Sequence, residues 1–305
     1  MVAMFVPRFA PRSLLIALIA MAAGTPARGA QFELPPLVQP ATTEHHVGKV
    51  IWADLVTPDL EGAKRFYGGL FGWTFRDIAG TPKEYSVALL DGEPVAGMVH
   101  RTESSGERHQ PAWLTFIAVR DVDAVKRIAA AHGGKLLAEP RSYPKRGRQA
   151  VFADPQGAVF SVLASATGDP PDVLAAPGDW IWSSLLARDP GADAAFYQAI
   201  FGYDVFDSET DDGLEHLVLS TDGFARASAN TLPGDASKRH PHWLNYVRVV
   251  DAAEAASKAT QLGGRVLVEP RVDRHGGRVA VVADPSGAPV GLLEWTDNDS
   301  KEVRK

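Results

Sequence analysis

The second half of the chain repeats the first at a constant spacing of 130 residues. Aromatic, glycine and turn motifs recur at this spacing without net insertion over most of each copy. The matching pairs are Trp52 and Trp182, Phe66-Tyr67 and Phe196-Tyr197, Phe71-Gly72 and Phe201-Gly202, Trp113 and Trp243, and Asp154-Pro155 and Asp284-Pro285. A repeat of this length predicts two copies of one structural unit. It also lets each residue be compared with its counterpart in the other copy.

Composition narrows the function classes. The chain has 305 residues, of which 45% are hydrophobic and 22% charged, as in ordinary globular proteins. Its formal net charge of -6 argues against a nucleic acid or an anionic membrane as partner, because both attract basic surfaces. The absence of cysteine excludes disulfides, thiolate metal sites and cysteine nucleophiles.

Residues 1–30 are predicted to be an export signal peptide, which would place the mature protein in the periplasm or outside the cell. Arg8 and Arg12 precede an apolar run at residues 14–23, and small residues follow. The run is short for a membrane span, and no cysteine is present for a lipid anchor. The alternative is an N-terminal helix of the fold. Residues 31–47 contain three prolines and are predicted to be a flexible tether, and residues 297–305 a tail.

Each copy is predicted to contain two modules of a strand, a helix and further strands. The first strands lie at residues 50–56 and 180–186, and the second modules begin near Trp113 and Trp243. An aspartate precedes each helix as a capping residue: Asp59, Asp121, Asp189 and Asp251. Residues 167–177, rich in Gly, Pro and Asp, are predicted to link the copies.

These motifs resemble those of the vicinal oxygen chelate superfamily, which includes glyoxalase I, bleomycin-resistance proteins and extradiol dioxygenases. The resemblance rests on Asp59-Leu60, Phe66-Tyr67, Phe71-Gly72 and Asp154-Pro155-Gln156-Gly157, with their repeats 130 residues on. It implies an α+β fold of four βαβββ modules, paired into two bidomains at residues 48–166 and 178–296. Each bidomain would be a curved, mixed eight-stranded sheet around a cleft, with the helices outside.

The resemblance also raises metal-dependent chemistry, because many members bind a divalent metal. Their ligands lie seven residues before the capping aspartate and four residues after the glycine of the D-P-x-G turn. Here those positions hold Trp52, Leu114, Ser161, Trp182, Leu244 and Gly291. None is a good ligand, so neither a metal nor another cofactor is expected. Three further residues are interpreted as structural: His46 in the tether, His132 at a helix end and Glu294 at a sheet edge.

Strand alternation predicts which side chains line the clefts. If the former ligand positions point inward, Trp52 and Asp54 line the first cleft, while Ile51, Ala53 and Leu55 face the helices. By the same reasoning, the second cleft is lined by Trp182, Ser184, His242 and Tyr246. Arg148 and Arg278 are further candidates, for an anionic ligand group. The alternatives are core filling for the tryptophans and structural salt bridges for the arginines.

Three functional interpretations remain open. The leading one is an exported monomer, with two bidomains in one chain, that binds a small organic molecule in aromatic-lined clefts without metal. The second is an enzyme of the superfamily, a lyase, isomerase or oxygenase, with displaced metal ligands or with acid–base groups such as Asp54 and His242. The third is a structural or protein-interaction scaffold.

Overall fold

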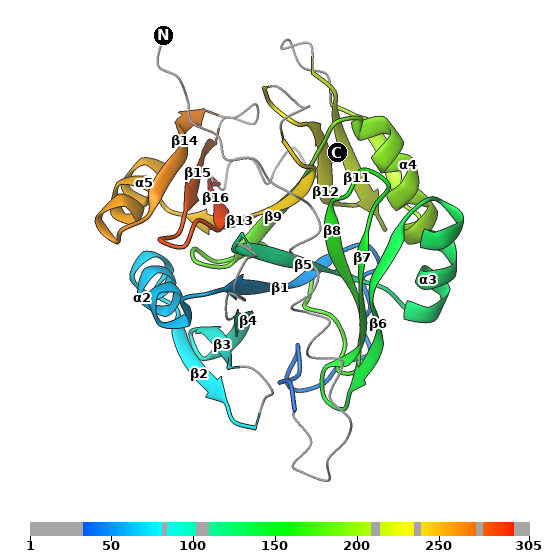
Figure 1. The fold of residues 1–305 in the computed structure, drawn as a ribbon, viewed down its shortest axis with the longest axis horizontal. Helices are drawn as coiled ribbons and strands as arrows, with labels where there is room; N and C mark the ends of the chain where they lie inside the picture. Colours follow the sequence, from blue (N-terminus) through cyan, green and yellow to red (C-terminus); the bar gives the residue numbers. More distant parts are fainter. Residues whose placement is uncertain are drawn as a thin grey trace, which may run out of the picture.

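The computed structural model describes residues 33–80, 84–101, 110–208, 214–234, 239–272 and 277–295. These residues form two eight-stranded mixed sheets and four helices, which confirms the predicted α+β fold (Figure 1). The predicted signal peptide and tail lie outside the described residues. None of the helices described is long and apolar enough to cross a membrane.

The first sheet is built from the first copy of the repeat, in the order β2-β3-β4-β1-β5-β8-β7-β6. Its centre is the antiparallel pair of β1 and β5, and each of these strands has a parallel neighbour, β4 or β8. The strands are β1 (Val50–Thr57), β2 (Thr74–Ile78), β3 (Tyr85–Leu90), β4 (Glu93–His100), β5 (Ala112–Ala118), β6 (Lys135–Tyr143), β7 (Gly147–Ala153) and β8 (Val159–Ser165).

The second sheet repeats this topology in the order β10-β11-β12-β9-β13-β16-β15-β14. Its strands are β9 (Trp180–Ala187), β10 (Asp204–Asp207), β11 (His216–Thr221), β12 (Phe224–Thr231), β13 (His242–Val249), β14 (Arg265–Val272), β15 (Arg278–Ala283) and β16 (Pro289–Glu294).

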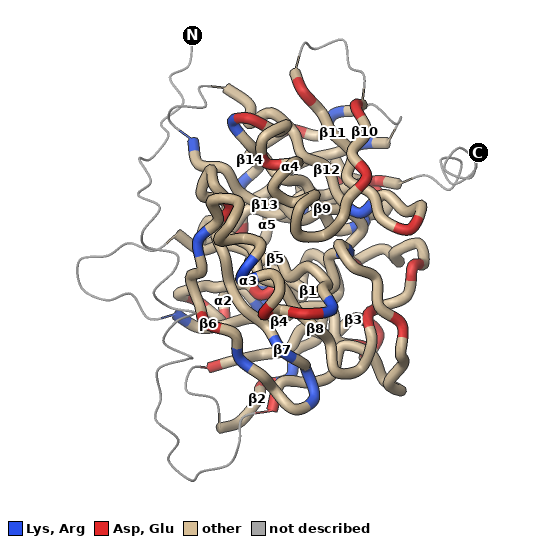
Figure 2. Tube along the Cα trace, turned by 90° about the vertical axis from the view of Figure 1, so that its right-hand side faces the viewer, with Lys and Arg blue, Asp and Glu red and all other residues tan. Residues whose placement is uncertain are grey.

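Figure 2 shows acidic and basic residues interspersed over both halves of the molecule.

Each helix begins where the sequence predicts it, at α2 (Leu60–Phe71), α3 (Val122–Ala131), α4 (Pro190–Phe201) and α5 (Ala252–Gln261). The side chains of the four predicted capping aspartates accept hydrogen bonds from first-turn amides, which have no partner within the helix. Gly72 and Gly202 end α2 and α4 with φ of 78° and 71°, a left-handed conformation that favours glycine.

The helices pack across the repeat rather than within it. Helix α2 lies beside α5, and α3 lies beside α4 (Figure 1). One apolar core contains Ala53, Leu55 and Phe66 of the first copy together with Val290 and Leu292 of the second. The other joins residues near α3, β7 and β8 to residues near α4 and β9–β12. Both helix-side cores therefore need both copies of the repeat.

Two buried polar chains also cross between the copies. Trp243 Nε1 donates to the Tyr197 hydroxyl at 2.9 Å, and that hydroxyl donates to Asp154 Oδ2 at 3.1 Å. The counterparts Trp113, Tyr67 and Asp284 form the same chain at 3.0 and 3.3 Å. Hydrogen bonds between the repeated aromatic residues and the D-P-x-G turns thus link the two copies.

Residues 33–38 and 45–47 differ from the predicted flexible tether, because they pack against the rest of the protein, whereas residues 39–44 between them are exposed. Leu34 and Leu37 are 5% and 7% exposed and belong to an apolar cluster with Trp52, Tyr85 and other residues of the first sheet. This N-terminal segment (residues 33–38) lies between the β2–β4 and β6–β8 halves of that sheet (Figure 1, dark blue). The free energy gained by burying the two leucines holds this segment in place, although its prolines had indicated a flexible tether.

Candidate functional site on the second sheet

Each sheet has one face covered by helices and an opposite face, the helix-free face. In β1, Ala53 and Leu55 belong to the helix-side core, as predicted, and Trp52 belongs to the cluster on the helix-free face. Ile51 was expected on the helix side, but it lies in the same cluster as Trp52. A register shift between Val50 and Trp52 breaks the alternation there.

The helix-free face of the first sheet is filled by the protein itself. Trp52 is 4% exposed, and the Arg146 guanidinium lies over its ring at 4.0 Å. Asp54 Oδ1 accepts hydrogen bonds from Trp52 Nε1 at 2.8 Å and from the Tyr85 hydroxyl at 2.9 Å. Burial raises the pKa of Asp54, and the charge of Arg146 and these two hydrogen bonds oppose the rise. Leu34 and Leu37 of the N-terminal segment fill the rest of this face.

The corresponding face of the second sheet carries a row of hydrogen-bonded polar groups. Ser228 Oγ accepts from Trp182 Nε1 at 3.1 Å and from Asn230 Nδ2 at 2.9 Å. Both of its lone pairs are then used, so its own proton points to Ser184 Oγ at 2.9 Å. At the other end of the row, His216 Nδ1 lies 3.1 Å from Asn230 Oδ1. The row therefore crosses three neighbouring strands, β11, β12 and β9.

Tyr246 on β13 ends this row. Burial raises the pKa of the Tyr246 phenol, while a hydrogen bond from Ser184 and the charge of Arg271 oppose the rise. Since Ser184 accepts from Ser228 in this row, its own proton is free to point to the phenol oxygen, which leaves the proton of Tyr246 to donate onward. The side chains of Tyr246 and Trp182 are both half-buried, and their strands pair directly at these two residues.

His242, further along β13, is also half-buried. Its Nδ1 lies 2.9 Å from the His240 carbonyl oxygen, which can only accept, so the neutral ring carries its proton on Nδ1. Burial lowers the pKa of His242, the hydrogen bond to the His240 backbone opposes this, and the nearby charge of Arg239 adds to the lowering. The imidazole is therefore neutral near pH 7, with Nε2 as an acceptor.

The residues present do not fit the superfamily's metal site. Gly291 has no side-chain ligand atom, and the Tyr246 ring covers it so closely that a Cβ there would clash with the ring. In the first sheet, the Ser161 hydroxyl donates to the Ala150 carbonyl oxygen at 2.9 Å. Within the described ranges, no group of three or more His, Asp or Glu side chains is arranged to hold a metal ion.

The remaining sequence candidates lie away from the helix-free faces. Arg148 pairs with Asp123 in the first turn of α3 at 2.9 Å, which is the structural salt bridge weighed as its alternative. Arg278 is exposed on β15, two residues from Ala280 of the helix-side core. Strand alternation therefore places Arg278 on the helix side, so neither arginine lies on a helix-free face. Glu294 accepts from the backbone amide of Ala252, at the start of α5.

Sequence reasoning missed several residues that shape the two faces, among them Arg146, Tyr85, His216, Ser228 and Asn230. For Arg146 the sequence did hold a signal, namely a difference between the two copies. Its counterpart in the second copy is Gly276, which has no side chain. The others became recognisable only through strand pairing, which sets Ser228 beside Ser184 and His216 beside Asn230.

Solved structures with this fold include a glyoxalase and a 2,3-dioxygenase. The Mn(II)-bound glyoxalase from Novosphingobium aromaticivorans is 16% identical, with a TM-score of 0.58, over 82% of this chain and 83% of that one. The 2,3-dioxygenase LapB from Pseudomonas sp. KL28 is 14% identical, also with a TM-score of 0.58, over 83% of this chain and 94% of its own. At these identities the similarity shows the fold alone. The fold and the repeat define a protein built from two tandem units of this fold.

Sequence comparisons give the family. Residues 45–162 match the glyoxalase/bleomycin resistance protein/dioxygenase superfamily, and residues 182–293 match a glyoxalase-like domain. The Mycobacterium tuberculosis protein named "Putative glyoxylase CFP32" is 34% identical over 84% of this chain and 98% of its own length. The anthracycline biosynthesis protein DauV of Streptomyces sp. strain C5 is 32% identical over 81% of this chain and 93% of its own. The chain belongs to the glyoxalase/bleomycin resistance protein/dioxygenase superfamily.

Proposed function

We propose that the protein binds a flat, ring-bearing organic molecule on the helix-free face of the second sheet, without a metal. The observation that carries this proposal is the contrast between the two faces. The first is filled by Arg146 and the N-terminal segment, whereas the second presents half-buried Trp182 and Tyr246 beside an ordered polar row. Aromatic walls with a few oriented polar groups are typical of small-molecule sites.

The polar row indicates which ligand groups would be recognised. The Tyr246 hydroxyl donates to a ligand oxygen, and the charge of Arg271 on β14 favours a carbonyl or anionic oxygen there. The Trp182 indole offers a surface for ring stacking. An aromatic ligand also agrees with the relative DauV, which is described as an anthracycline biosynthesis protein.

The experiment is a titration of the purified protein with anthraquinone-2-sulfonate, followed by tryptophan fluorescence. Tyr246→Phe removes only the donating hydroxyl and is expected to weaken binding about five- to tenfold, as for one hydrogen bond of about 1 kcal/mol. Trp182→Ala is expected to weaken binding further. Addition of EDTA leaves the affinity unchanged if no metal takes part.

The matched control is Tyr203→Phe, at a tyrosine buried in the helix-side core. It removes the same hydroxyl on the opposite side of the sheet from the proposed site and leaves the affinity unchanged. Equal affinities for the wild type and for the Tyr246 and Trp182 variants, all folded, would place any binding elsewhere.

A second candidate function, metal-free acid–base catalysis, is favoured by one observation. His242 carries its proton on Nδ1 when neutral, so Nε2 is free of a proton and able to act as a base. A glyoxalase assay on the metal-free protein tests this function, with His242→Gln as the variant. Turnover by the wild type that His242→Gln abolishes supports an enzyme, and equal rates contradict it.

We further propose that the protein is exported as a monomer after removal of about thirty residues. N-terminal sequencing of protein from cells and from the medium or periplasm tests the cleavage, and sedimentation tests the monomer. An intact Met1 on a cytosolic protein would contradict export.

A further inference from the structure

The N-terminal segment occupies the place on the first sheet that corresponds to the proposed ligand face of the second. Its leucines Leu34 and Leu37 are packed with Trp52, Tyr85 and other apolar residues of that face. The repeat does not require this arrangement, because residues 33–38 precede the first copy. The face is therefore covered by an added piece of chain.

Arg146 makes the polar contact to this segment. Its Nε donates to the Pro35 carbonyl oxygen at 2.8 Å, while its guanidinium lies over the Trp52 ring at 4.0 Å. The side chain is 1% exposed, and its Nη2 has no hydrogen-bond partner among the described residues. A buried guanidinium nitrogen without a partner is costly. The segment thus supplies a single acceptor to the Arg146 guanidinium, and a second acceptor oxygen would give Nη2 a hydrogen-bond partner.

The segment is held more loosely than the chain that follows it. Beyond the Arg146 bond, its polar ties are an exposed ion pair of Glu33 with Lys145 and a 3.4 Å hydrogen bond from the Val38 amide to Thr167 Oγ1. Residues 39–44 are all exposed. A surface ion pair contributes little, so the two leucines are the main anchors.

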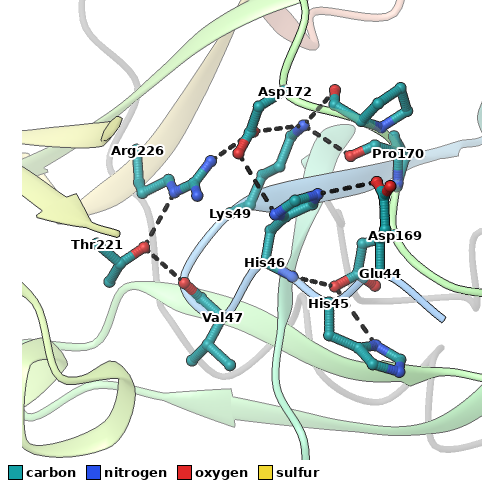
Figure 3. A network of polar contacts seen from close by, with 11 residues as sticks. Glu44, His45, His46, Val47, Lys49, Asp169, Pro170, Asp172, Thr221 and Arg226 are labelled. Carbon is teal, nitrogen blue, oxygen red and sulfur yellow. Dashed lines mark hydrogen bonds and ion pairs between the residues drawn. The ribbon is translucent and has the colours of Figure 1, made fainter. Parts of the chain in front are cut away.

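The chain is fixed again immediately after this exposed stretch (Figure 3). The His46 amide donates to Asp169 Oδ2 at 2.8 Å, and Lys49 Nζ pairs with Asp172 at 2.9 Å. Asp172 also pairs with Arg226 of the second copy. This network holds residues 46–49 at the start of β1 independently of the N-terminal segment. The segment can therefore leave while β1 stays in place.

We propose that the helix-free face of the first sheet is a second binding site, for an apolar molecule with a carbonyl or carboxylate oxygen, which residues 33–38 close in cis. In this arrangement Leu34 and Leu37 stand in for the apolar body of the ligand, and the Pro35 carbonyl stands in for its oxygen. A carboxylate would accept from Nε and Nη2 of Arg146 together, which a single peptide carbonyl does not. Trp52 forms the wall, and Asp54 holds its indole in place.

The test opens the site after the protein has folded. A site-specific protease sequence is inserted between Ala41 and Thr42 of the full chain, both exposed, and is cut in the purified protein. Gel filtration then separates the released peptide, which mass spectrometry identifies. The probe is 8-anilinonaphthalene-1-sulfonate, an apolar ring system with an anionic group. The expected result is one additional probe molecule bound per chain after cleavage, with near-ultraviolet circular dichroism unchanged.

The matched controls are Arg146→Ala and Arg148→Ala in the cleavable protein. The first removes the buried guanidinium and is expected to abolish the additional binding, whereas the second removes a partly buried arginine two residues away, paired with Asp123 on the helix side, and leaves the binding intact. A synthetic peptide of residues 33–38 is expected to compete for the gained site. Retention of the cleaved peptide through gel filtration, or its release without a gain in probe binding, overturns the proposal. Since the gain is counted relative to the uncut protein, the result does not depend on whether the second sheet binds the probe.

Discussion

Two tryptophans at matching places in the repeat have different surroundings. Trp52 is 4% exposed beneath Arg146 and the N-terminal segment, whereas Trp182 is half-buried. The side chains around them decide this difference, since Asp54 accepts the indole proton in the first copy and Ser228 in the second. An identical residue in each repeat therefore serves packing in one copy and is available for binding in the other.

A stability comparison separates these roles. Trp52→Ala is expected to lower the free energy of unfolding by about 3–5 kcal/mol, as for a fully buried aromatic side chain. Trp182→Ala is expected to cost clearly less, because part of its surface is already exposed to water. Urea unfolding of both variants measures the difference, and equal losses would contradict it.

Asp193 gives a pH-dependent prediction. Its side chain is fully buried in α4, and burial, assisted by the charge of Asp154, raises its pKa to about 7. Ionisation is therefore harder in the folded protein than in the unfolded chain, where the pKa is about 4. The wild type should lose stability as pH rises from about 4 to about 7, and the full cost remains above 7.

Asp193→Ala removes this cost, and the first copy already has an alanine, Ala63, at the counterpart position. The variant is expected to gain about 2–4 kcal/mol relative to the wild type between pH 4.5 and pH 8, at 1.36 kcal/mol per pKa unit. Asp207→Ala, at an exposed carboxylate, is the control. A stability difference that does not change with pH would contradict the assignment.

At the scale of elements, local sequence accounts for where helices begin and end, and tertiary contacts explain why the motifs repeat. The hydroxyls of Tyr67 and Tyr197 each link a helix of one copy to a D-P-x-G turn of the other. In both cases a tryptophan of the tyrosine's own copy donates to the same hydroxyl. Each hydroxyl thus satisfies two buried groups at once.

Removal of either hydroxyl should therefore be costly. Tyr197→Phe and Tyr67→Phe are each expected to lower the free energy of unfolding by about 1–3 kcal/mol, because a buried donor and a carboxylate lose a partner. The two effects should add in the double variant, since the chains lie in separate cores. Thermal and urea unfolding of the three variants measure this, and unchanged stability would mean that water replaces the hydroxyl.

For the whole molecule, the shared cores predict that the two copies unfold together. A fragment of residues 48–166 would expose the sides of α2 and α3 that pack on α5 and α4. We expect neither this fragment nor residues 178–296 to unfold cooperatively alone, while the full chain shows one transition. Calorimetry of the fragments and the full chain tests this, and a stable, cooperative fragment would refute it.

The sequence by itself determined the four modules and the helix caps, because these depend on periodicity and on residues close in the chain. The pairing of the modules into two sheets was implied by the family resemblance. The sequence also placed Trp52, Asp54, Trp182, Ser184, His242 and Tyr246 on their strands. Only the tertiary structure decided which face is filled, since Leu34 and Arg146 reach Trp52 from distant parts of the chain. The cores shared between copies and the row through Ser228 were hidden for the same reason: strand alternation indicates which way most side chains point, but long-range packing decides which residues they contact.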